Sequence, residues 1–240
     1  MILLISGSVQ AGSRTLAAVT AAACVLEQRG LRTRVWDLAQ SPLPIADPRY
    51  YECPADHPDL RVRELVEAAA AASGFVLASP LYHNAYCGAL KNCLDHLSIE
   101  QFASKPVGLI SFGGTLTAIQ VCDQLQIVVR GLYGLALPVQ VVTVPDDFER
   151  LDGGFRLVAA DRLRRLEWMA DEICQYLSGR RGKVSSRPKR RRDLAAQAPP
   201  PATDLAGEVE RPVQSRSWAR DSPVLAQYGG DLYLDQALQD

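Results

Sequence analysis

MILLISGSVQAGSRTL, residues 1–16, joins a short apolar run to a loop of glycines and hydroxyl residues. Met1–Ile5 is typical of a buried strand, and the alanine-rich stretch 17–26 favours a helix. Between a strand and a helix start, backbone N–H groups lie at the positive end of the helix dipole, where phosphate binds. The loop has neither the G-x-G-x-x-G fingerprint nor a G-K-[ST] ending. It predicts a cradle for a dianionic monophosphate, and the alternative is a capped turn with no ligand.

Composition and charge divide the chain in two. Of its 240 residues, 48% are hydrophobic, enough for the core of one domain. Residues 1–178 carry 15 Lys and Arg against 19 Asp and Glu, whereas residues 179–240 carry 11 against 8. Eight of the thirteen residues 180–192 are basic, and several proline steps follow without a sustained apolar period. We therefore expect a folded domain at 1–178, and at 179–240 a basic linker and C-terminal tail that is disordered or docks onto a partner.

The cysteine pattern indicates a reducing compartment. The six cysteines form no C-x-x-C pair, and only three histidines exist to complete a metal site. The apolar run at the N-terminus is about five residues long and lacks a basic leader, unlike a signal peptide or a membrane span. We expect a cytoplasmic, soluble protein with reduced thiols and no metal.

Strand-like and helix-like segments alternate through the first 178 residues. The expected strands are 1–6, 32–37, 74–78, 106–111 and 137–144, and the expected helices are 17–30, 60–72, 88–97, 115–132 and 157–177. Strict alternation predicts an α/β fold with a five-stranded parallel sheet and helices on both faces. A phosphate loop after the first strand favours the flavodoxin-like strand order 2-1-3-4-5. In that order the ligand crevice lies beyond the carboxyl ends of the first, third and fourth strands.

Two more loops with unusual composition fall at this crevice. SPLYHNAYCGALKNCLD, residues 79–95, combines a proline, two tyrosines and an amide, which suits a flat ring with heteroatoms at its rim. SFGGT, residues 111–115, has paired glycines that let the backbone approach a ligand closely. Packing alone explains three such loops poorly, although Tyr82 and Tyr86 taken singly fit half-buried packing as well as ring contacts.

At these motifs the chain resembles the NADPH-dependent FMN reductases of flavodoxin-like fold. The resemblance runs from residue 1 to about 177 and rests on GSVQAGSRT, PLYHNAYCGALKNCLDHL and SFGGT. Pro-x-Tyr followed by Gly-x-Leu-Lys-Asn and Asp is its most specific part. It departs from many sulfonate-linked members at Ala118 and Gln124, where those carry a histidine and an aromatic residue, and this leaves the electron acceptor open.

The resemblance implies FMN and NADPH or NADH as cofactors, with hydride transfer between them. It places the FMN phosphate on the loop and the isoalloxazine ring against the two later segments. Gln10 replaces a common arginine, and Arg14 is the residue expected to compensate. The cofactor-binding residues expected in this way are Ser8, Gln10, Ser13, Arg14, Thr15, Pro80, Leu81, Tyr82, His83, Asn84, Ser111, Gly113 and Gly114. No catalytic residue is expected, because the two cofactors perform the transfer themselves.

Three functions remain open at this point. The first is an FMN reductase that supplies reduced flavin to a monooxygenase. The second is a reductase of quinones, azo dyes or chromate that retains its FMN. The third is a non-catalytic flavodoxin-like adaptor whose tail is the functional part. A Ser111, His96 and Asp95 hydrolase triad is disfavoured, because no G-x-S-x-G elbow surrounds the serine and the other two are adjacent on a helix.

Partners are expected from two apolar regions. The stretch 115–132 carries apolar residues on several faces, which indicates a homodimer or homotetramer interface. The end of the tail regains apolar residues after the basic run, a pattern typical of docking onto another protein. The basic run has no interleaved aromatic residues, so nucleic acid is not an expected partner.

Overall fold

The computed structural model describes residues 1–179. The predicted tail, with its basic run and its apolar end, lies outside the described residues from position 180 onward, and so does its expected role in docking.

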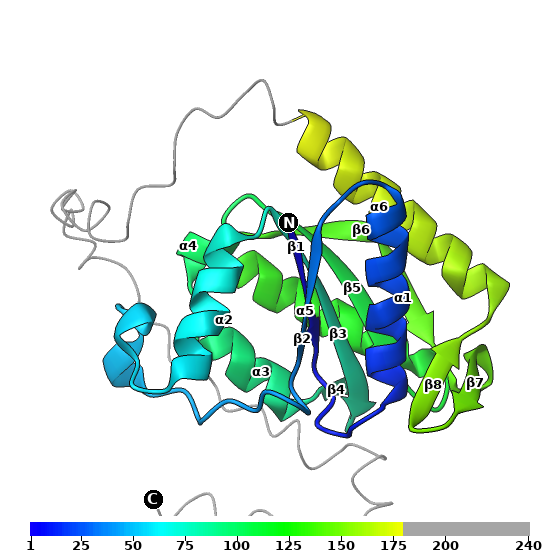
Figure 1. The fold of residues 1–240 in the computed structure, drawn as a ribbon, viewed down its shortest axis with the longest axis horizontal. Helices are drawn as coiled ribbons and strands as arrows, with labels where there is room; N and C mark the ends of the chain where they lie inside the picture. Colours follow the sequence, from blue (N-terminus) through cyan, green and yellow to red (C-terminus); the bar gives the residue numbers. More distant parts are fainter. Residues whose placement is uncertain (180–240) are drawn as a thin grey trace, which may run out of the picture. The chain divides into compact units, whose positions relative to one another are not determined.

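The five expected parallel strands form one sheet. They are β1 (Ile2–Ser6), β2 (Thr33–Asp37), β3 (Gly74–Tyr82), β5 (Pro106–Phe112) and β6 (Leu135–Thr143). They lie in the order β2-β1-β3-β5-β6, and every neighbouring pair is parallel (Figure 1). In chain order of the parallel strands this is 2-1-3-4-5, so the flavodoxin-like topology is confirmed.

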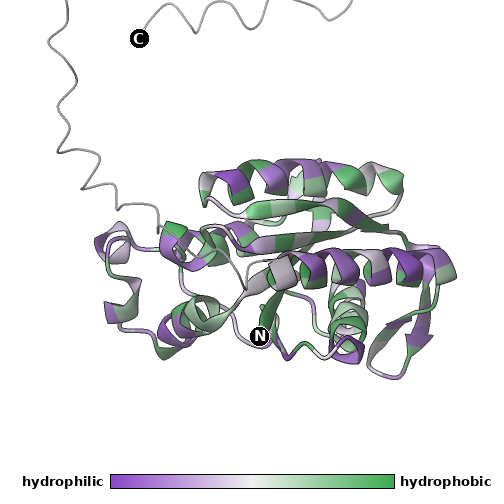
Figure 2. Ribbon diagram, turned by 90° about the horizontal axis from the view of Figure 1, so that it is seen from above, coloured by the Kyte–Doolittle hydropathy of each residue, from purple (hydrophilic) through white to green (hydrophobic). Residues whose placement is uncertain are grey.

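Helices cover both faces of this sheet. They are α1 (Arg14–Gln28), α2 (Leu60–Ala71), α3 (Gly88–Asp95), α4 (Ile99–Phe102), α5 (Ile119–Gly131) and α6 (Ala160–Gly179). One core cluster joins the sheet to α1 and α6, and the other joins it to α2, α3 and α5. Seen from above, the strands form a largely hydrophobic layer between helices of mixed hydropathy (Figure 2).

Burial on both faces explains why β1 is apolar throughout. Successive side chains of a strand point to opposite faces. Leu3 and Ile5 accordingly pack in the cluster with α2 and α3, whereas Ile2 and Leu4 pack in the cluster with α1 and α6. All four side chains are fully buried. A central parallel strand therefore needs a continuous apolar run rather than an alternating one.

The structure contains two small hairpins that the sequence pattern did not predict. β3 continues past residue 78 to Tyr82 and pairs back with β4 (Ala85–Tyr86), so the start of the expected loop 79–95 is strand. Strands β7 (Phe148–Leu151) and β8 (Gly154–Leu157) form a separate antiparallel pair. Because β8 takes up residues 154–157, α6 begins at Ala160 and not at the expected residue 157.

Other expected boundaries shift where short turns intervene. Helix 115–132 divides into a 3₁₀ turn, η3 (Leu116–Ala118), and α5, and β6 begins two residues earlier than expected. The proline-rich connection before α2 contains two 3₁₀ turns, η1 (Pro48–Tyr50) and η2 (Pro54–Asp56), each with proline at its start. A third, η4 (Pro145–Asp147), leads into β7. Proline suits such positions because its missing N–H would be unpaired there anyway.

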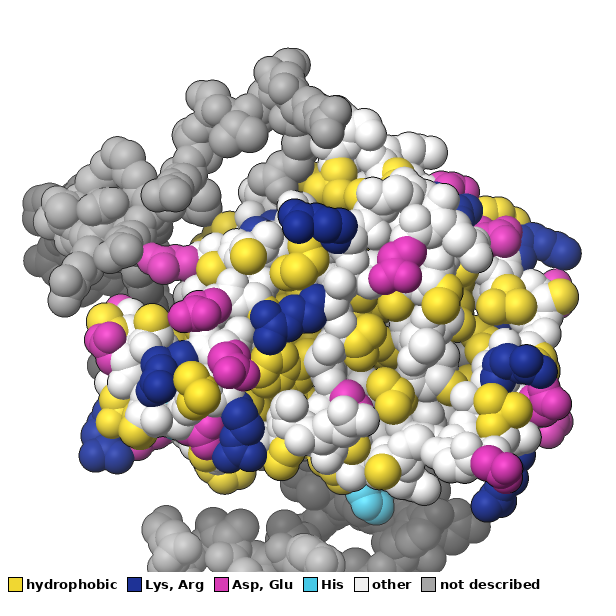
Figure 3. All heavy atoms as spheres, viewed as in Figure 1, with side chains coloured by type: hydrophobic (Ala, Val, Ile, Leu, Met, Phe, Trp, Pro, Cys, Tyr) yellow, Lys and Arg dark blue, Asp and Glu magenta, His cyan; other side chains and the backbone are white. Residues whose placement is uncertain are grey.

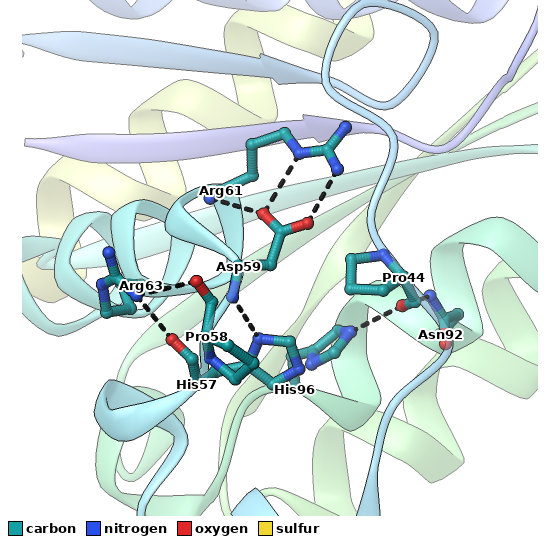
Figure 4. Close-up of polar contacts among 8 residues, drawn as sticks. All are labelled: Pro44, His57, Pro58, Asp59, Arg61, Arg63, Asn92 and His96. Carbon is teal, nitrogen blue, oxygen red and sulfur yellow. Dashed lines mark hydrogen bonds and ion pairs between the residues drawn. The ribbon is translucent and has the colours of Figure 1, made fainter.

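Side chains of α3 and its C-terminal end hold the proline-rich connection in place (Figure 4). The carbonyl of Pro44 accepts the Asn92 side-chain amide at 2.8 Å and lies 2.9 Å from His96 Nε2. At the far end, the Asp59 amide donates to His57 Nδ1 at 3.0 Å, and Arg63 donates to the His57 carbonyl at 2.7 Å. Two buried histidines thus anchor a segment that has no regular ladder of its own.

Candidate functional site

The strand register brings the predicted loops to one end of the sheet. Ser6, the last residue of β1, pairs with Ala78, and Ser79 pairs with Ser111. The β1–α1 loop, β4 and the β7–β8 hairpin all lie at this end (Figure 1). The crevice expected from the topology is therefore where the three motifs meet.

Two serine hydroxyl groups of the loop after β1 form hydrogen bonds with backbone amides of the loop and of the first turn of α1. The Ser8 Oγ accepts the Gln10 amide at 3.2 Å, and the Ser13 Oγ, at the N-cap of α1, accepts the Leu16 amide at 3.1 Å. Ser8, Ser13 and Thr15 are buried. These contacts order the loop around the start of a 15-residue helix, which begins at Arg14, three residues before the expected residue 17.

Several amides of this loop remain available to a ligand. Among residues 1–179, no backbone or side-chain acceptor pairs with the amides of Ala11, Gly12 and Thr15. Amides in the first turn of a helix have no partner within the helix and carry its partial positive charge. The FMN phosphate that the family resemblance implies fits these residues.

Glycine is required at the two ends of the loop. A Cβ on Gly7 would lie 2.7 Å from the Ala78 carbonyl oxygen, on the neighbouring strand. Gly12 has a φ of +62°, and a Cβ there would lie 2.2 Å from the carbonyl oxygen of Gly153 in the β7–β8 turn. The loop is therefore fitted between the sheet and the hairpin.

Arg14 and Gln10 differ in their surroundings. Gln10 is exposed at the loop. The Arg14 guanidinium carbon lies 3.9 Å from the ring centroid of Phe155 and 5.6 Å from that of Phe112. The Arg14 side chain thus lies against the rings of β8 and β5.

The second segment forms a tight turn at the end of β3. His83 and Asn84 have φ values of +50° and +62°, and they join β3 to β4 as a two-residue hairpin turn. A two-residue hairpin loop favours a positive φ at both central residues, and a loop of this kind without a glycine is uncommon. Side-chain exposure rises along the segment. Pro80 is buried, Leu81 is half-buried, and Tyr82, His83 and Asn84 are exposed.

Two hydrogen bonds hold this segment. The Ser79 Oγ accepts the Cys87 amide at 2.9 Å, which closes the β3–β4 hairpin from below. Gln124 of α5 donates its side-chain amide to the carbonyl of Asn84 at 2.7 Å. Gln124, one of the two departures from the family pattern, therefore has a structural contact that the sequence pattern does not predict.

The third segment divides into buried and open residues. Ser111 is fully buried in the sheet, and its carbonyl accepts the Thr143 hydroxyl at 2.7 Å. A Cβ on Gly113 would lie 2.8 Å from the Ala118 Cβ and 3.3 Å from the Leu81 Cβ, so this glycine is needed for packing. Gly114 has no atom within 4 Å of that position and is exposed. Of this segment's predicted contacts, Gly114 alone lies on an open surface.

The cysteines near the site are structural. Burial raises the pKa of the Cys93 thiol far above its ordinary value and raises that of Cys122 to about 12. The Cys87 thiol donates to the Gly7 carbonyl at 2.9 Å. A thiolate is the reactive form, and raised values disfavour it.

No catalytic triad forms around Ser111. His96 Nε2 contacts the Pro44 carbonyl, and Asp95 pairs with Lys91, one turn earlier on α3, at 2.5 Å. In the part of the chain that the structure describes, His, Cys, Asp and Glu side chains form no group of three or more suited to a metal ion. None of the described helices combines the length and apolar character needed to cross a membrane.

Sequence reasoning missed the β7–β8 hairpin as a neighbour of the phosphate loop. Its turn, Asp152-Gly153-Gly154, contains the Asp-Gly pair that is a strong short-range hairpin signal. The sequence analysis assigns no element to residues 145–156, which include both strands of the hairpin apart from Leu157. The hairpin contacts Gly12, which lies 141 positions before Gly153 in the chain, and no local sequence pattern predicts a contact over that separation.

Comparison with known proteins identifies the family of this chain. The profile of the NADPH-dependent FMN reductases matches residues 1–149. An FMN-dependent NADPH-azoreductase of Staphylococcus saprophyticus is 34% identical over 176 residues, which cover 73% of this chain and 94% of that protein. The corresponding azoreductase of Staphylococcus aureus is 33% identical over 177 residues, with the same coverage.

Solved structures share the fold. The apo form of the NADH:FMN oxidoreductase EMOB superposes with a TM-score of 0.60 at 24% identity and covers 80% of this chain and 97% of its own. FerB of Paracoccus denitrificans, an NAD(P)H:acceptor oxidoreductase, superposes with a TM-score of 0.59 at 14% identity, covering 74% and 97%. Given the match over more than half of its length and the curated relatives, the chain belongs to the NADPH-dependent FMN reductase family.

Proposed function

We propose that this chain is an NAD(P)H:FMN oxidoreductase that binds FMN across the three loops at the carboxyl end of its sheet. The observation that carries the proposal is the loop between β1 and α1, where unpaired amides, buried hydroxyls and a helix start surround one point. A phosphate there puts the rest of the flavin over the ends of β3 and β5, because β3 lies next to β1 in the sheet and β5 lies next to β3.

Each group of residues has a separate task. Ser8, Ser13, Thr15 and the loop amides hold the phosphate, and Gln10 lies at the exposed rim. Pro80, Leu81 and the turn Tyr82–Asn84 orient the ring, with Gly114 at its far edge. When bound, FMN accepts a hydride from the nicotinamide ring of NADPH or NADH, so the protein needs to hold two rings in contact and exclude water.

The first test is the visible spectrum of the purified full-length chain, followed by NADPH and NADH oxidation with and without added FMN. Oxidation that depends on added FMN supports a flavin reductase that exchanges its flavin with a monooxygenase. Absence of oxidation with any flavin or quinone contradicts the enzymatic proposal and favours the adaptor alternative.

A second candidate is an azoreductase that retains its FMN. The names of the two staphylococcal relatives favour it, since both are FMN-dependent NADPH-azoreductases. A yellow protein that bleaches an azo dye with NADPH, and keeps its flavin through gel filtration, supports this function. Dye reduction that appears only with excess free FMN supports the exchanging reductase. Quinone and chromate serve as further acceptors in the same assay.

The homodimer or homotetramer remains part of the proposal. Val121, Leu125 and Val129 of α5 are buried in the core, which accounts for part of the apolar character of the stretch 115–132. Ile119 and Ile127 are 37% and 61% exposed, and Leu116 of η3 is 61% exposed. A second copy covering these side chains would remove apolar surface from water. Sedimentation of the parent and of Ile127→Asp tests this, with a larger monomer fraction expected for the variant.

The tail is proposed to direct the reductase to a partner protein. The full chain and a variant ending at residue 179 are compared for FMN-dependent NADPH oxidation and for protein complexes. Unchanged activity with loss of a complex supports docking. Deletion that changes neither ends the idea.

Nucleic acid is not a proposed partner. On the face drawn in Figure 3, Lys and Arg side chains are interspersed with Asp and Glu, so no large patch of one sign forms there. Binding to nucleic acid depends on such a patch.

A further inference from the structure

The β7–β8 hairpin touches the phosphate loop at two independent points. The first is the backbone contact between Gly12 and Gly153, which leaves no room for a Cβ on Gly12. The second is the stacking of Arg14 on Phe155, with the guanidinium carbon 3.9 Å from the ring centroid. The hairpin therefore meets the loop at its left-handed residue and at the first residue of α1.

Arg14 has an environment of rings and no anion. Phe112, at the end of β5, lies on the same guanidinium at 5.6 Å. The Arg14 Nε is buried and has no hydrogen-bond partner, and no carboxylate of the described residues forms an ion pair with Arg14. A cation over aromatic faces gains energy that is larger when water is excluded. The stacking is thus what holds this side chain.

The β7–β8 hairpin is held in place by its own contacts with the rest of the domain, so it can restrict the conformation of the phosphate loop that packs against it. The Asp147 carbonyl, at its base, accepts the amides of Val158 and Ala159 at 2.9 and 3.2 Å. The Asp147 carboxylate pairs with Arg162 of α6 at 3.1 Å. The ring of Phe148 packs edge-on against Phe112, with centroids 5.9 Å apart. These contacts fix both strands relative to the sheet.

We propose that Phe155 and Arg14 are positioning residues for FMN binding: the Phe155–Arg14 stack locks the phosphate loop in its binding conformation, and Arg14 is not a direct phosphate ligand. This rests on the proposed function, in which the loop binds the FMN phosphate. The hairpin thereby sets how strongly the protein distinguishes FMN from riboflavin, which lacks the phosphate.

The test measures dissociation constants for FMN and riboflavin by flavin fluorescence on the purified full-length chain. Phe155→Leu keeps apolar bulk and removes the ring. We expect it to weaken FMN binding about tenfold and riboflavin binding less than twofold, since losing one cation–π contact is of that size. Phe155→Tyr keeps the ring and should restore FMN affinity to within twofold of the parent. Leu151→Ala removes apolar bulk from the same hairpin at a position that is 44% exposed, and it should leave both affinities unchanged.

Arg14 variants separate positioning from direct charge attraction. Arg14→Lys keeps the charge but loses the flat guanidinium, and Arg14→Gln loses both. We expect the two variants to weaken FMN binding to within threefold of each other. Parent-like FMN affinity in Arg14→Lys alone means that the charge binds the phosphate directly, and this overturns the proposal.

Two other outcomes also decide the matter. Equal losses of FMN and riboflavin affinity in Phe155→Leu, or no loss of either, contradict a role in phosphate positioning. Failure of the proposed function looks different, because the parent chain itself then binds FMN no better than riboflavin.

Discussion

The side-chain amide of Gln124 donates to the carbonyl of Asn84 at 2.7 Å, which ties helix α5 to the left-handed turn between β3 and β4. The turn holds His83 and Asn84 in the left-handed conformation, which costs energy for residues other than glycine. Contacts with neighbouring residues must offset this cost. Gln124 is one such contact, and it comes from an element 40 residues away.

Gln124→Leu should weaken the binding of FMN and riboflavin by a similar factor of about threefold, the size of one hydrogen bond. In the proposed site the turn lies under the ring that both flavins share, so the phosphate should make no difference here. Flavin fluorescence titration measures both constants. Gln126→Leu, an exposed position on the same helix, is the matched control and should bind both like the parent. A loss confined to FMN would contradict the placement of the ring.

Gly12→Ala should abolish tight FMN binding, because the new Cβ would lie 2.2 Å from the Gly153 carbonyl oxygen. Gly30→Ala is the control, since Gly30 also has a positive φ, +77°, but no atom within 4 Å of a Cβ. Both variants have the left-handed strain, about 1–2 kcal/mol. Thermal unfolding and FMN titration are measured for both variants. An effect common to both comes from backbone strain, and an additional effect in Gly12→Ala comes from the steric clash with Gly153. Equal behaviour of the two variants would show that the hairpin does not constrain the loop.

Thiol labelling should sort the cysteines by burial. At pH 8 the exposed Cys24 and Cys53 should react with iodoacetamide within minutes. Cys93 and Cys122 should remain unmodified in the folded protein, because burial raises their pKa values and keeps the thiolate scarce. Peptide mass spectrometry reads each site, and labelling in denaturant, where all six should react, is the control. Rapid modification of Cys93 in the native state would contradict its burial.

Replacing Asp37 or Asp59 by asparagine should change the stability of the folded chain at pH 7 in opposite directions, because the pKa of Asp37 is raised and that of Asp59 is lowered. Burial raises the pKa of Asp37 above its ordinary value, so its folded form favours the neutral carboxyl. Stability from this group is present below the unfolded pKa and is lost as pH rises through the folded pKa. Asp37→Asn should therefore unfold at a higher temperature than the parent at pH 7, and the gain should vanish toward pH 3. Calorimetry across this range checks the sign.

Asp59 provides the opposite case. Hydrogen bonds from the Arg61 side chain and amide lower the Asp59 pKa to about 2. Its stabilising contribution is present above the unfolded pKa of about 4 and is lost as pH falls toward 2. Asp59→Asn should thus be less stable than the parent at pH 7 and approach it near pH 2. A Tm difference that does not change with pH would contradict the assignment of Arg61 as the cause.

Local sequence determined the five parallel strands, the main helices between them and their order. The apolar run of β1, the hydroxyl N-cap Ser13 and the alternation of strands with helices each act within a few residues, and right-handed crossovers then leave few strand orders. For the same reason the sequence located the three loops of the candidate site, since the ends of neighbouring parallel strands must meet. The β7–β8 turn was also marked, by Asp152-Gly153, but its strands are only four residues long and carry a weak period.

Tertiary structure alone decided which atoms of those loops are exposed and which are used for packing. Arg14 lies on Phe155, Gly113 makes room for Ala118, and Ser111 is buried in the sheet. Each of these depends on a partner from another element, and periodicity carries no information about such partners. The sequence thus determined the topology and the site, because those follow from local propensity and chain connectivity. The roles of single side chains depended on packing between elements that are distant in the chain.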